Sequence, residues 1–320
     1  MSQSHIISCE HEAYDLLTLV SYKILHEGES TMQKFIITTE NTADLPASYY
    51  VENEIEYMYL PCTMNGKVYD KENALSDEEF YKIMREGAMP TTSQVNAEDA
   101  KAVWKPMLEA GQDILHLSFS SGLSGTYNSC RIGAEELKEE FPEGKLIVID
   151  SVCASLGQGL FVDKAVELRA KGLSIEEVAK HLEDNKLSFC HVFTVDDLHH
   201  LHRGGRVSKM AAVIGTMINL KPVLHVNDEG KLIPVDKVRG RKKSLLRLVD
   251  MMQEKIADYK GEAGKVFISH GDALEDAQFL AKNIKEKLGR EVTIINPVGA
   301  TIGAHAGPGT IALFFMGTKR

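Results

Sequence analysis

Residues 116–140 read HLSFSSGLSGTYNSCRIGAEELKEE, and this stretch decides the fold. An apolar run ends at Phe119, a loop of serine, glycine and threonine follows, and a helical pattern begins at about Tyr127. A short buried strand that leads through a turn into an amphipathic helix is typical of α/β proteins. The sequence therefore predicts a strand and a helix here, joined by a polar turn at the carboxyl end of the strand.

The same unit recurs on both sides of this stretch. FIITT at 35–39 precedes a helix near Pro46, and KLIVID at 145–150 precedes a helix from about Gly157 to Ala170. Apolar runs of this length that alternate with helices predict an N-terminal domain with a mainly parallel sheet, covered by helices on both faces. Ligands of such sheets bind beyond the carboxyl ends of the strands.

Two segments depart from this pattern. Asn65-Gly66 lies between apolar stretches, which is typical of a β-hairpin. Short alternating strands such as KPVLHVNDEGKLIPVDKV at 221–238 predict a C-terminal α/β domain with a more antiparallel sheet. We therefore expect an α/β protein of two domains, residues 34–186 and residues 187–320, preceded by an N-terminal extension, residues 1–33.

The composition of the chain limits its partners. It has 320 residues, 43% of them hydrophobic, and a net charge of −10, so a general nucleic-acid-binding surface is not expected. No run of about 18 apolar residues occurs, and we expect no stable membrane insertion. The five cysteines lie far apart without a C-x-x-C pair, which favours a reducing cytoplasm and argues against disulfides or a zinc site.

The turn at 118–126 is rich in hydroxyl side chains and glycines. Because a helix begins there, free backbone N–H groups and the positive end of the helix dipole would stabilise a carboxylate or a phosphate. An ordinary N-cap with a tight turn is the alternative. Three further loops have the same chemistry: PTTSQ at 90–94, DSVCASLGQG at 150–159 and AHAGPGT at 304–310. Their number favours an anion site.

Catalytic and cofactor motifs fit this turn poorly. GLSGT at 122–126 has a threonine where a nucleophile elbow has its last glycine, although a serine esterase that uses Ser124 is the main alternative function. No G-K-[ST] follows the glycines, which excludes a P-loop. TTENTADLP after the first strand is not a G-x-G-x-x-G motif, so we expect no dinucleotide and no other cofactor.

A cluster of histidines lies in DDLHHLHRGGR at 196–206. His199 and His202 share one face of the expected helix, while His200 points elsewhere, so we do not expect a metal site. The two glycines end this helix and leave Arg206 in a loop. There its guanidinium group either meets a phosphate or carboxylate or is a plain surface residue.

A basic segment, KVRGRKKSLLR at 237–247, contains six basic residues and no acid. Such a run is either the exposed start of a helix or a docking patch for an acidic partner. The second interpretation would make the chain an interaction protein.

Eight segments, taken in chain order, resemble the DegV family of bacterial proteins. They read IITTENTADLP, PTTSQ, SFSSGLSGTYNS, IDSVCASLGQG, FTVDDLHHLHRGGRVS, GTMINLKPVLHVNDEGKL, KVRGRKKSL and HAGPGTIALFF. The resemblance extends from Lys34 to the C-terminus. It implies a two-domain protein that holds a long-chain fatty acid between its domains and is not itself an enzyme. It also implies a partner, the ATP-dependent catalytic subunit of a fatty acid kinase, to which this carrier presents the carboxylate for acyl-phosphate formation.

The resemblance also implies roles for particular residues. Thr92 and Ser124 correspond to hydroxyl groups that bind the carboxylate, and His305 corresponds to a histidine at the head group. Arg206 matches a loop that is expected to face the kinase. Secondary ligand contacts are expected from four neighbours: Thr91, Ser93, Ser121 and Gly125.

The chain departs from the family pattern at two places. The first loop reads Glu40-Asn41-Thr42 where the family usually has Asp-Ser-Thr, which weakens any assignment of a role to that acidic residue. The segment before Met32 has no counterpart in the family. We hypothesise that the native protein starts at Met32, and we expect no function for the extension.

Overall fold

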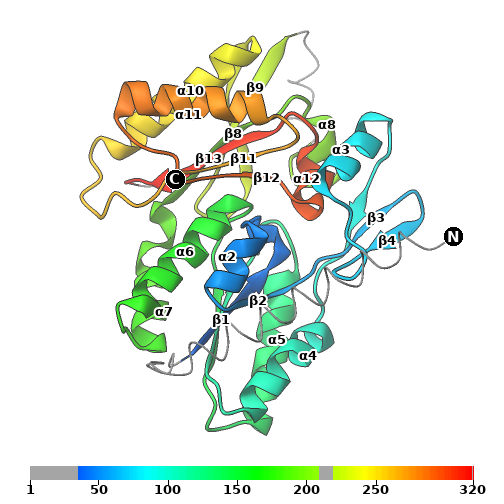
Figure 1. The fold of residues 1–320 in the computed structure, drawn as a ribbon, viewed down its shortest axis with the longest axis vertical. Coiled ribbons are helices and arrows are strands. Elements are labelled where there is room, and N and C mark those ends of the chain that lie inside the picture. Colours follow the sequence, from blue (N-terminus) through cyan, green and yellow to red (C-terminus); the bar gives the residue numbers. More distant parts are fainter. Residues whose placement is uncertain (1–34, 209–218, 319) are drawn as a thin grey trace, which may run out of the picture. The chain divides into compact units, whose positions relative to one another are not determined.

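The structure is a computed structural model that describes residues 35–208, 219–318 and 320 (Figure 1). The predicted extension at 1–33 and the hypothetical start at Met32 lie outside the described residues. Three sheets occur within the described part of the chain. We call the four-stranded one sheet A, the three-stranded one sheet B and the six-stranded one sheet C.

Sheet A has the strand order β2-β1-β6-β7, and all its pairings are parallel. Its strands are β1 (Ile36–Glu40), β2 (Ile55–Met58), β6 (Ile114–Ser118) and β7 (Leu146–Asp150). Ile114 packs in one apolar cluster with Trp104, and its neighbour Leu115 packs in another with Phe161. Since successive side chains of a strand point to opposite faces, the sheet is buried on both sides. This confirms the prediction of a parallel sheet covered on both faces.

The helices that cover sheet A form two pairs (Figure 1). They are α4 (Ala97–Glu109) with α5 (Thr126–Glu140) on one face, and α6 (Leu156–Ala170) with α7 (Ile175–Asn185) on the other. Helix α4 begins with a capping box, in which the Asn96 side chain accepts from the Asp99 N–H and the Asp99 side chain accepts from the Asn96 N–H. Helix α5 starts within one residue of the position expected from the sequence.

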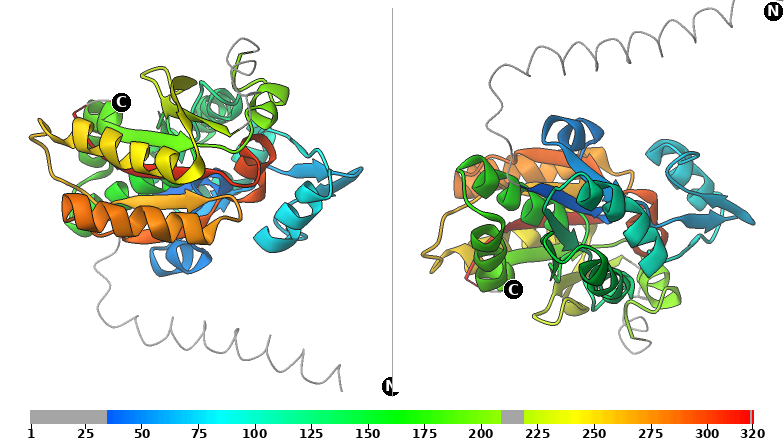
Figure 2. Two further views of the ribbon diagram at one scale, coloured as in Figure 1. Left: turned by 90° about the horizontal axis from the view of Figure 1, so that it is seen from above. Right: turned by 90° about the horizontal axis from the view of Figure 1, so that it is seen from below.

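Sheet C has the strand order β10-β9-β8-β13-β11-β12. Its strands are β8 (Phe189–Thr194), β9 (Leu220–Val226), β10 (Leu232–Arg239), β11 (Phe267–His270), β12 (Ile294–Pro297) and β13 (Ile311–Met316). All pairings are antiparallel except that of β11 with β12. The prediction of a more antiparallel C-terminal sheet is therefore confirmed. Helices α10 (Arg241–Ile256) and α11 (Leu274–Leu288) lie side by side on its outer face (Figure 2).

Helix α6 packs between sheets A and C, where it contacts β1 and β6 of one and β8, β11 and β13 of the other. Its first eight residues are all buried, so this part of the helix has no exposed polar face. The Phe161 ring meets Phe189 of β8 edge-on, with 4.9 Å between ring centroids. Gly159 permits close packing, because a β-carbon there would lie 2.8 Å from the carbonyl oxygen of Ala43. Helix α6 thus belongs to the hydrophobic core on the facing sides of both sheets.

Sheet B is formed by β3 (Cys62–Met64), β4 (Lys67–Tyr69) and β5 (Thr91–Thr92). Asn65 and Gly66 both have left-handed backbones, with φ of 51° and 77°, as a two-residue hairpin turn requires. The predicted hairpin is confirmed. Helices α3 (Asp77–Arg85) and α12 (Ala300–Ala306) share an apolar cluster with this sheet, and the Tyr81 hydroxyl donates to the Val298 carbonyl at 2.8 Å.

The remaining elements are short: the 3-10 turns η1 (Asn41–Ala43) and η2 (Lys186–Ser188), and the helices α2 (Ala47–Glu52) and α8 (His199–Arg203). The expected domain boundary at 186/187 falls within η2, after the last strand of sheet A and before the first of sheet C; the boundary itself stays a prediction. None of the described helices is both long and apolar enough to span a membrane. The four described cysteines are buried: Cys62, Cys130, Cys153 and Cys190.

Candidate functional site

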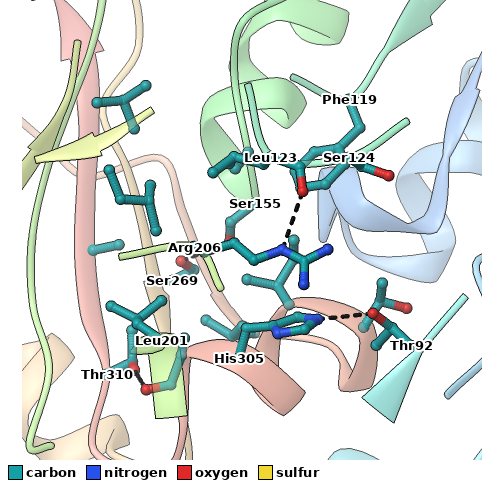
Figure 3. Close-up of a pocket in the computed structure, with 18 of the residues that line it drawn as sticks. Thr92, Phe119, Leu123, Ser124, Ser155, Leu201, Arg206, Ser269, His305 and Thr310 are labelled. Carbon is teal, nitrogen blue, oxygen red and sulfur yellow. Dashed lines mark hydrogen bonds between the residues drawn. The ribbon is translucent and has the colours of Figure 1, made fainter. Parts of the chain in front are cut away.

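A cavity of about 200 Å³ is lined by residues of sheet C, of the loops that follow strands of sheet A, of β5 and of α12 (Figure 3). Most of its wall is apolar, with Phe119 from the end of β6, Phe193 from β8 and Phe314 from β13. Its polar groups include the hydroxyls of Thr92 and Ser124, the imidazole of His305 and the guanidinium group of Arg206. A site of this kind suits a mostly apolar molecule whose polar end is fixed by a few directed groups.

One polar contact joins Thr92 of β5 to His305 of α12, where Thr92 Oγ1 lies 2.7 Å from His305 Nε2 (Figure 3). Burial lowers the pKa of the His305 imidazole to about 4, and the positive charges of Arg206 and Arg203 add to this effect. The ring is therefore neutral at pH 7. With the hydrogen on Nε2, it donates to Thr92 Oγ1 and leaves the threonine hydroxyl hydrogen available to an anion.

Ser124 lies on the cavity wall at the beginning of α5. Its Oγ accepts from the Thr126 N–H at 3.2 Å and lies 2.9 Å from Thr126 Oγ1. Within the described residues, the Ser124 side chain bonds to these groups of Thr126 rather than to a histidine or a carboxyl group. A serine hydrolase needs such a base beside its nucleophile, so this arrangement does not favour the esterase alternative.

Gly125 and Arg206 complete this end of the cavity. A β-carbon at Gly125 would lie 2.2 Å from Gln94 Oε1, so a larger residue there would have to displace the end of the Gln94 side chain. Arg206 Nε donates to the Leu123 carbonyl at 3.1 Å, and Nη1 donates to the Gly204 carbonyl. The guanidinium group thus reaches the cavity beside the loop that carries Ser124 (Figure 3), and burial lowers its pKa.

The structure brings most of the predicted residues together, but not all of them. Six line the cavity: Thr92, Ser93, Ser124, Gly125, Arg206 and His305. Thr91 and Ser121 are exposed and do not line it. The backbone N–H of Ser121 instead donates to Asp150 Oδ1 at 3.1 Å. The roles of these residues toward a ligand stay predictions.

The histidines of 196–206 lie on or next to the short helix α8. His202 Nδ1 faces the Val207 carbonyl at 3.4 Å, and His199 is exposed. Among the described residues, the group that brings three potential metal ligands together is elsewhere: Glu40, His116 and Cys130, all fully buried. The basic segment at 237–247 covers the end of β10 and the start of α10, so its second half is indeed a helix start.

A series of hydrogen-bonded polar side chains in the cavity wall was not predicted from the sequence. Ser155 Oγ lies 2.6 Å from Asp44 Oδ2 and 2.9 Å from Ser269 Oγ, and both serines line the cavity. Ser155 precedes α6 with φ 53° and ψ −147°, a backbone conformation that non-glycine residues rarely adopt. Burial raises the pKa of the Asp44 carboxyl to about 8. The motif DSVCASLGQG predicted a polar loop here, but nothing in the sequence indicates that this loop contacts Asp44.

Gly204 controls the position of the His305 ring, because a β-carbon there would lie 2.1 Å from His305 Nδ1. We expect Gly204→Ala to push the ring out of its buried place. Relief of burial should then raise the pKa of His305 from about 4 toward the ordinary value of about 6.5. NMR titration of the histidine resonances measures this change. An unchanged titration of His305 in Gly204→Ala would contradict the packing argument.

The fold and the cavity define an α/β protein with an internal site for a small, mostly apolar molecule. The family model of the DegV family, described as uncharacterised proteins, matches residues 34–318. The chain therefore belongs to the DegV family, which confirms the resemblance found in its motifs. A DegV domain-containing protein of Clostridium perfringens is 43% identical over 291 residues, which cover 90% of this chain and 99% of that protein.

Two solved structures are similar over nearly their whole length. One is a DegV lipid-binding protein from Thermotoga maritima, with 31% identity and a TM-score of 0.77, covering 90% of this chain and 99% of that one. The other is a DegV family protein from Thermus thermophilus described by its fatty acid binding, with 30% identity and a TM-score of 0.79, covering 89% and 99%.

Proposed function

We propose that this protein binds a long-chain fatty acid in the cavity, with the carboxylate held by Thr92, Ser124 and the neutral His305. The observation that carries the proposal is the contact between Thr92 and His305, which places directed polar groups at one place in a mostly apolar wall. A buried carboxylate without donors would be costly; the hydroxyl groups of Thr92 and Ser124 would supply them, with Thr92 oriented by the His305 ring. The fatty acid binding of solved relatives supports the same assignment.

The acyl chain would supply most of the affinity. Burial of CH₂ groups contributes about 0.8 kcal/mol each, or a gross gain on the order of 10 kcal/mol for a long chain before the costs of binding. Phe119, Phe193 and Phe314 provide apolar wall for this purpose. The first experiment is native mass spectrometry of the purified protein, followed by extraction of the ligand. A protein that carries no lipid and also fails to bind added palmitic or oleic acid would overturn the proposal.

We expect Thr92→Ala and Ser124→Ala each to weaken fatty acid binding by about 1 to 3 kcal/mol, because each removes a donor to a buried charged group. Titration calorimetry with palmitic acid measures the loss. Thr91→Ala and Ser121→Ala are matched controls, since these exposed neighbours do not line the cavity, and they should bind as the wild type does. Equal losses in a variant and its matched control would contradict this assignment of the head-group site.

We also propose that the protein is the cytoplasmic, non-enzymatic carrier of a fatty acid kinase. Donors that hold a carboxylate also suit the additional oxygens of an acyl phosphate. Arg206, half-buried between the cavity and the loop at Leu123, would stand near the kinase. The test supplies the loaded protein with ATP and a candidate catalytic subunit, and traps acyl phosphate as a hydroxamate. Hydroxamate formed by the loaded protein and ATP without that subunit would overturn the non-enzyme part.

A further inference from the structure

Asn41 lies in the turn after β1, outside the cavity wall, and joins two segments that are far apart in the chain. Its side-chain Nδ2 donates to Thr301 Oγ1 of α12 at 2.9 Å, and its Oδ1 accepts from the Leu60 N–H at 2.9 Å. Thr301 Oγ1 in turn donates to the Leu60 carbonyl at 2.8 Å. These three hydrogen bonds form a closed ring that holds Leu60 and Thr301 together.

Each of the two joined segments leads to one half of the head-group site. Leu60 lies two residues before Cys62 of β3, and Cys62 pairs with Thr92 of β5. Thr301 lies about one helical turn before His305 on α12. The Thr92 hydroxyl and the His305 ring, whose contact is 2.7 Å long, thus belong to the two segments that the asparagine joins.

Helix α12 needs support of this kind. It has only seven residues, which are too few for a helix to be stable by its own hydrogen bonds. Its N-cap is Gly299, which has no side-chain oxygen for the first turn. Asp44 Oδ1 accepts from the Gly299 N–H at 3.1 Å, and the Asp44 carbonyl accepts from Asn296 Nδ2 at 2.8 Å. The position of α12 therefore depends in part on residues 41–44.

We propose that Asn41 is a positioning residue of the fatty acid site, which sets the distance between Thr92 and His305 without touching the ligand. The inference rests on the proposed fatty acid binding and adds to it a residue that does not line the cavity. If the two segments move apart, the ring no longer donates to Thr92 Oγ1, and the hydroxyl hydrogen is no longer directed toward a carboxylate. Binding then weakens although both head-group residues are present.

The first test is titration of palmitic acid into Asn41→Ala by calorimetry, together with NMR titration of its histidines. Affinity should fall roughly tenfold, the typical effect of losing one such hydrogen-bonding group. Because burial lowers the pKa of His305 to about 4, release of α12 should raise it toward the ordinary value of about 6.5. Asn283→Ala is the matched control and should leave both results unchanged. This half-buried asparagine of α11 donates to the Phe279 carbonyl of its own helix, and α11 does not line the cavity.

A double variant separates positioning from a general loss of stability. If Asn41 acts through Thr92, Asn41→Ala should weaken binding less than about twofold when Thr92 is already alanine. A full tenfold loss in that background would overturn the inference, as would wild-type affinity or an unchanged His305 titration in Asn41→Ala. If the alanine variant does not fold, Asn41→Asp keeps the shape and the oxygen for Leu60 but removes the N–H donor to Thr301. If palmitic acid does not bind the wild type, the proposed function fails as well, so the two failures are distinguishable.

Discussion

The wild-type protein is expected to lose stability as the pH rises from about 4 to about 8, and Asp44→Asn is expected to remove much of this dependence. Burial raises the pKa of the Asp44 carboxyl to about 8 in the folded protein, whereas in the unfolded chain it has its ordinary value of about 3.9. Between these values the folded state holds a proton that the unfolded state has released. Stability must therefore fall as pH increases through this range.

The size of the effect follows from the shift. One pKa unit corresponds to about 1.4 kcal/mol, so a rise of about four units amounts to several kcal/mol of stability that is present below pH 4 and lost by about pH 8. The hydrogen bonds from Ser155 and Gly299 lower the pKa of Asp44, but the effect of burial is larger. Ser155 has one hydroxyl hydrogen and two oxygen neighbours, so Asp44 or Ser269 must donate to it. Asparagine keeps an oxygen for the Gly299 N–H, which lies 3.1 Å from Oδ1.

Urea unfolding at several pH values measures the difference between the variant and the wild type. Asp44→Asn should gain stability relative to the wild type as pH rises from 5 to 8, as described by linkage. Asp184→Asn, on the exposed face of α7, is the control and should give a curve parallel to that of the wild type. A constant difference between Asp44→Asn and the wild type would show that Asp44 is already ionised in the folded protein.

Glu40→Ala is expected to lower the free energy of unfolding by about 3 to 5 kcal/mol, as removal of one partner from a buried polar network does. Glu40 is fully buried at the end of β1. Its oxygens accept from Ser118 Oγ at 2.7 Å, the Phe119 N–H at 2.9 Å and Gln158 Nε2 at 2.7 Å. His116 Nε2 lies 3.2 Å from the same carboxyl group. The alanine variant would leave the Ser118 hydroxyl and the Phe119 N–H buried without this acceptor.

Glu40→Gln is the matched control, because it keeps the shape of the side chain and one acceptor oxygen. It should lose clearly less stability than Glu40→Ala in chemical denaturation. Equal losses would mean that the carbon atoms of Glu40, rather than its acceptor oxygens, support the turn after β6. The acidic residue that departs from the family pattern thus has a structural assignment: it holds the first residue of the loop that leads to Ser124.

Local features of the sequence predicted much of the fold. Asn65-Gly66 specified its hairpin because the two left-handed residues are a local requirement. The alternation of apolar runs and helical patterns gave sheet A and its two covering layers. The order of strands in sheet C could not be predicted from local patterns. The position of β13 between β8 and β11 depends on contacts between segments far apart in the chain.

Residues of the candidate site were predicted from the sequence only where they belong to the motifs of the family resemblance. The resemblance singled out Thr92 and His305, yet nothing in their spacing shows that residues 213 positions apart share a hydrogen bond. Thr91 and Ser121 belong to the same motifs as residues that line the cavity, but they are exposed and lie outside its wall.

The central place of β13 has a consequence for how the protein is made. Of the described strands, β13 leaves the ribosome last, yet it fills the gap between β8 and β11. Until Ile311 to Met316 are synthesised, both neighbours have open edges, which attract other strands and promote aggregation. Ala312 and Phe314 are also absent from the cavity wall at that stage. A nascent chain would thus be unable to take up a lipid early, and chaperones would need to shield it until translation reaches the final strand.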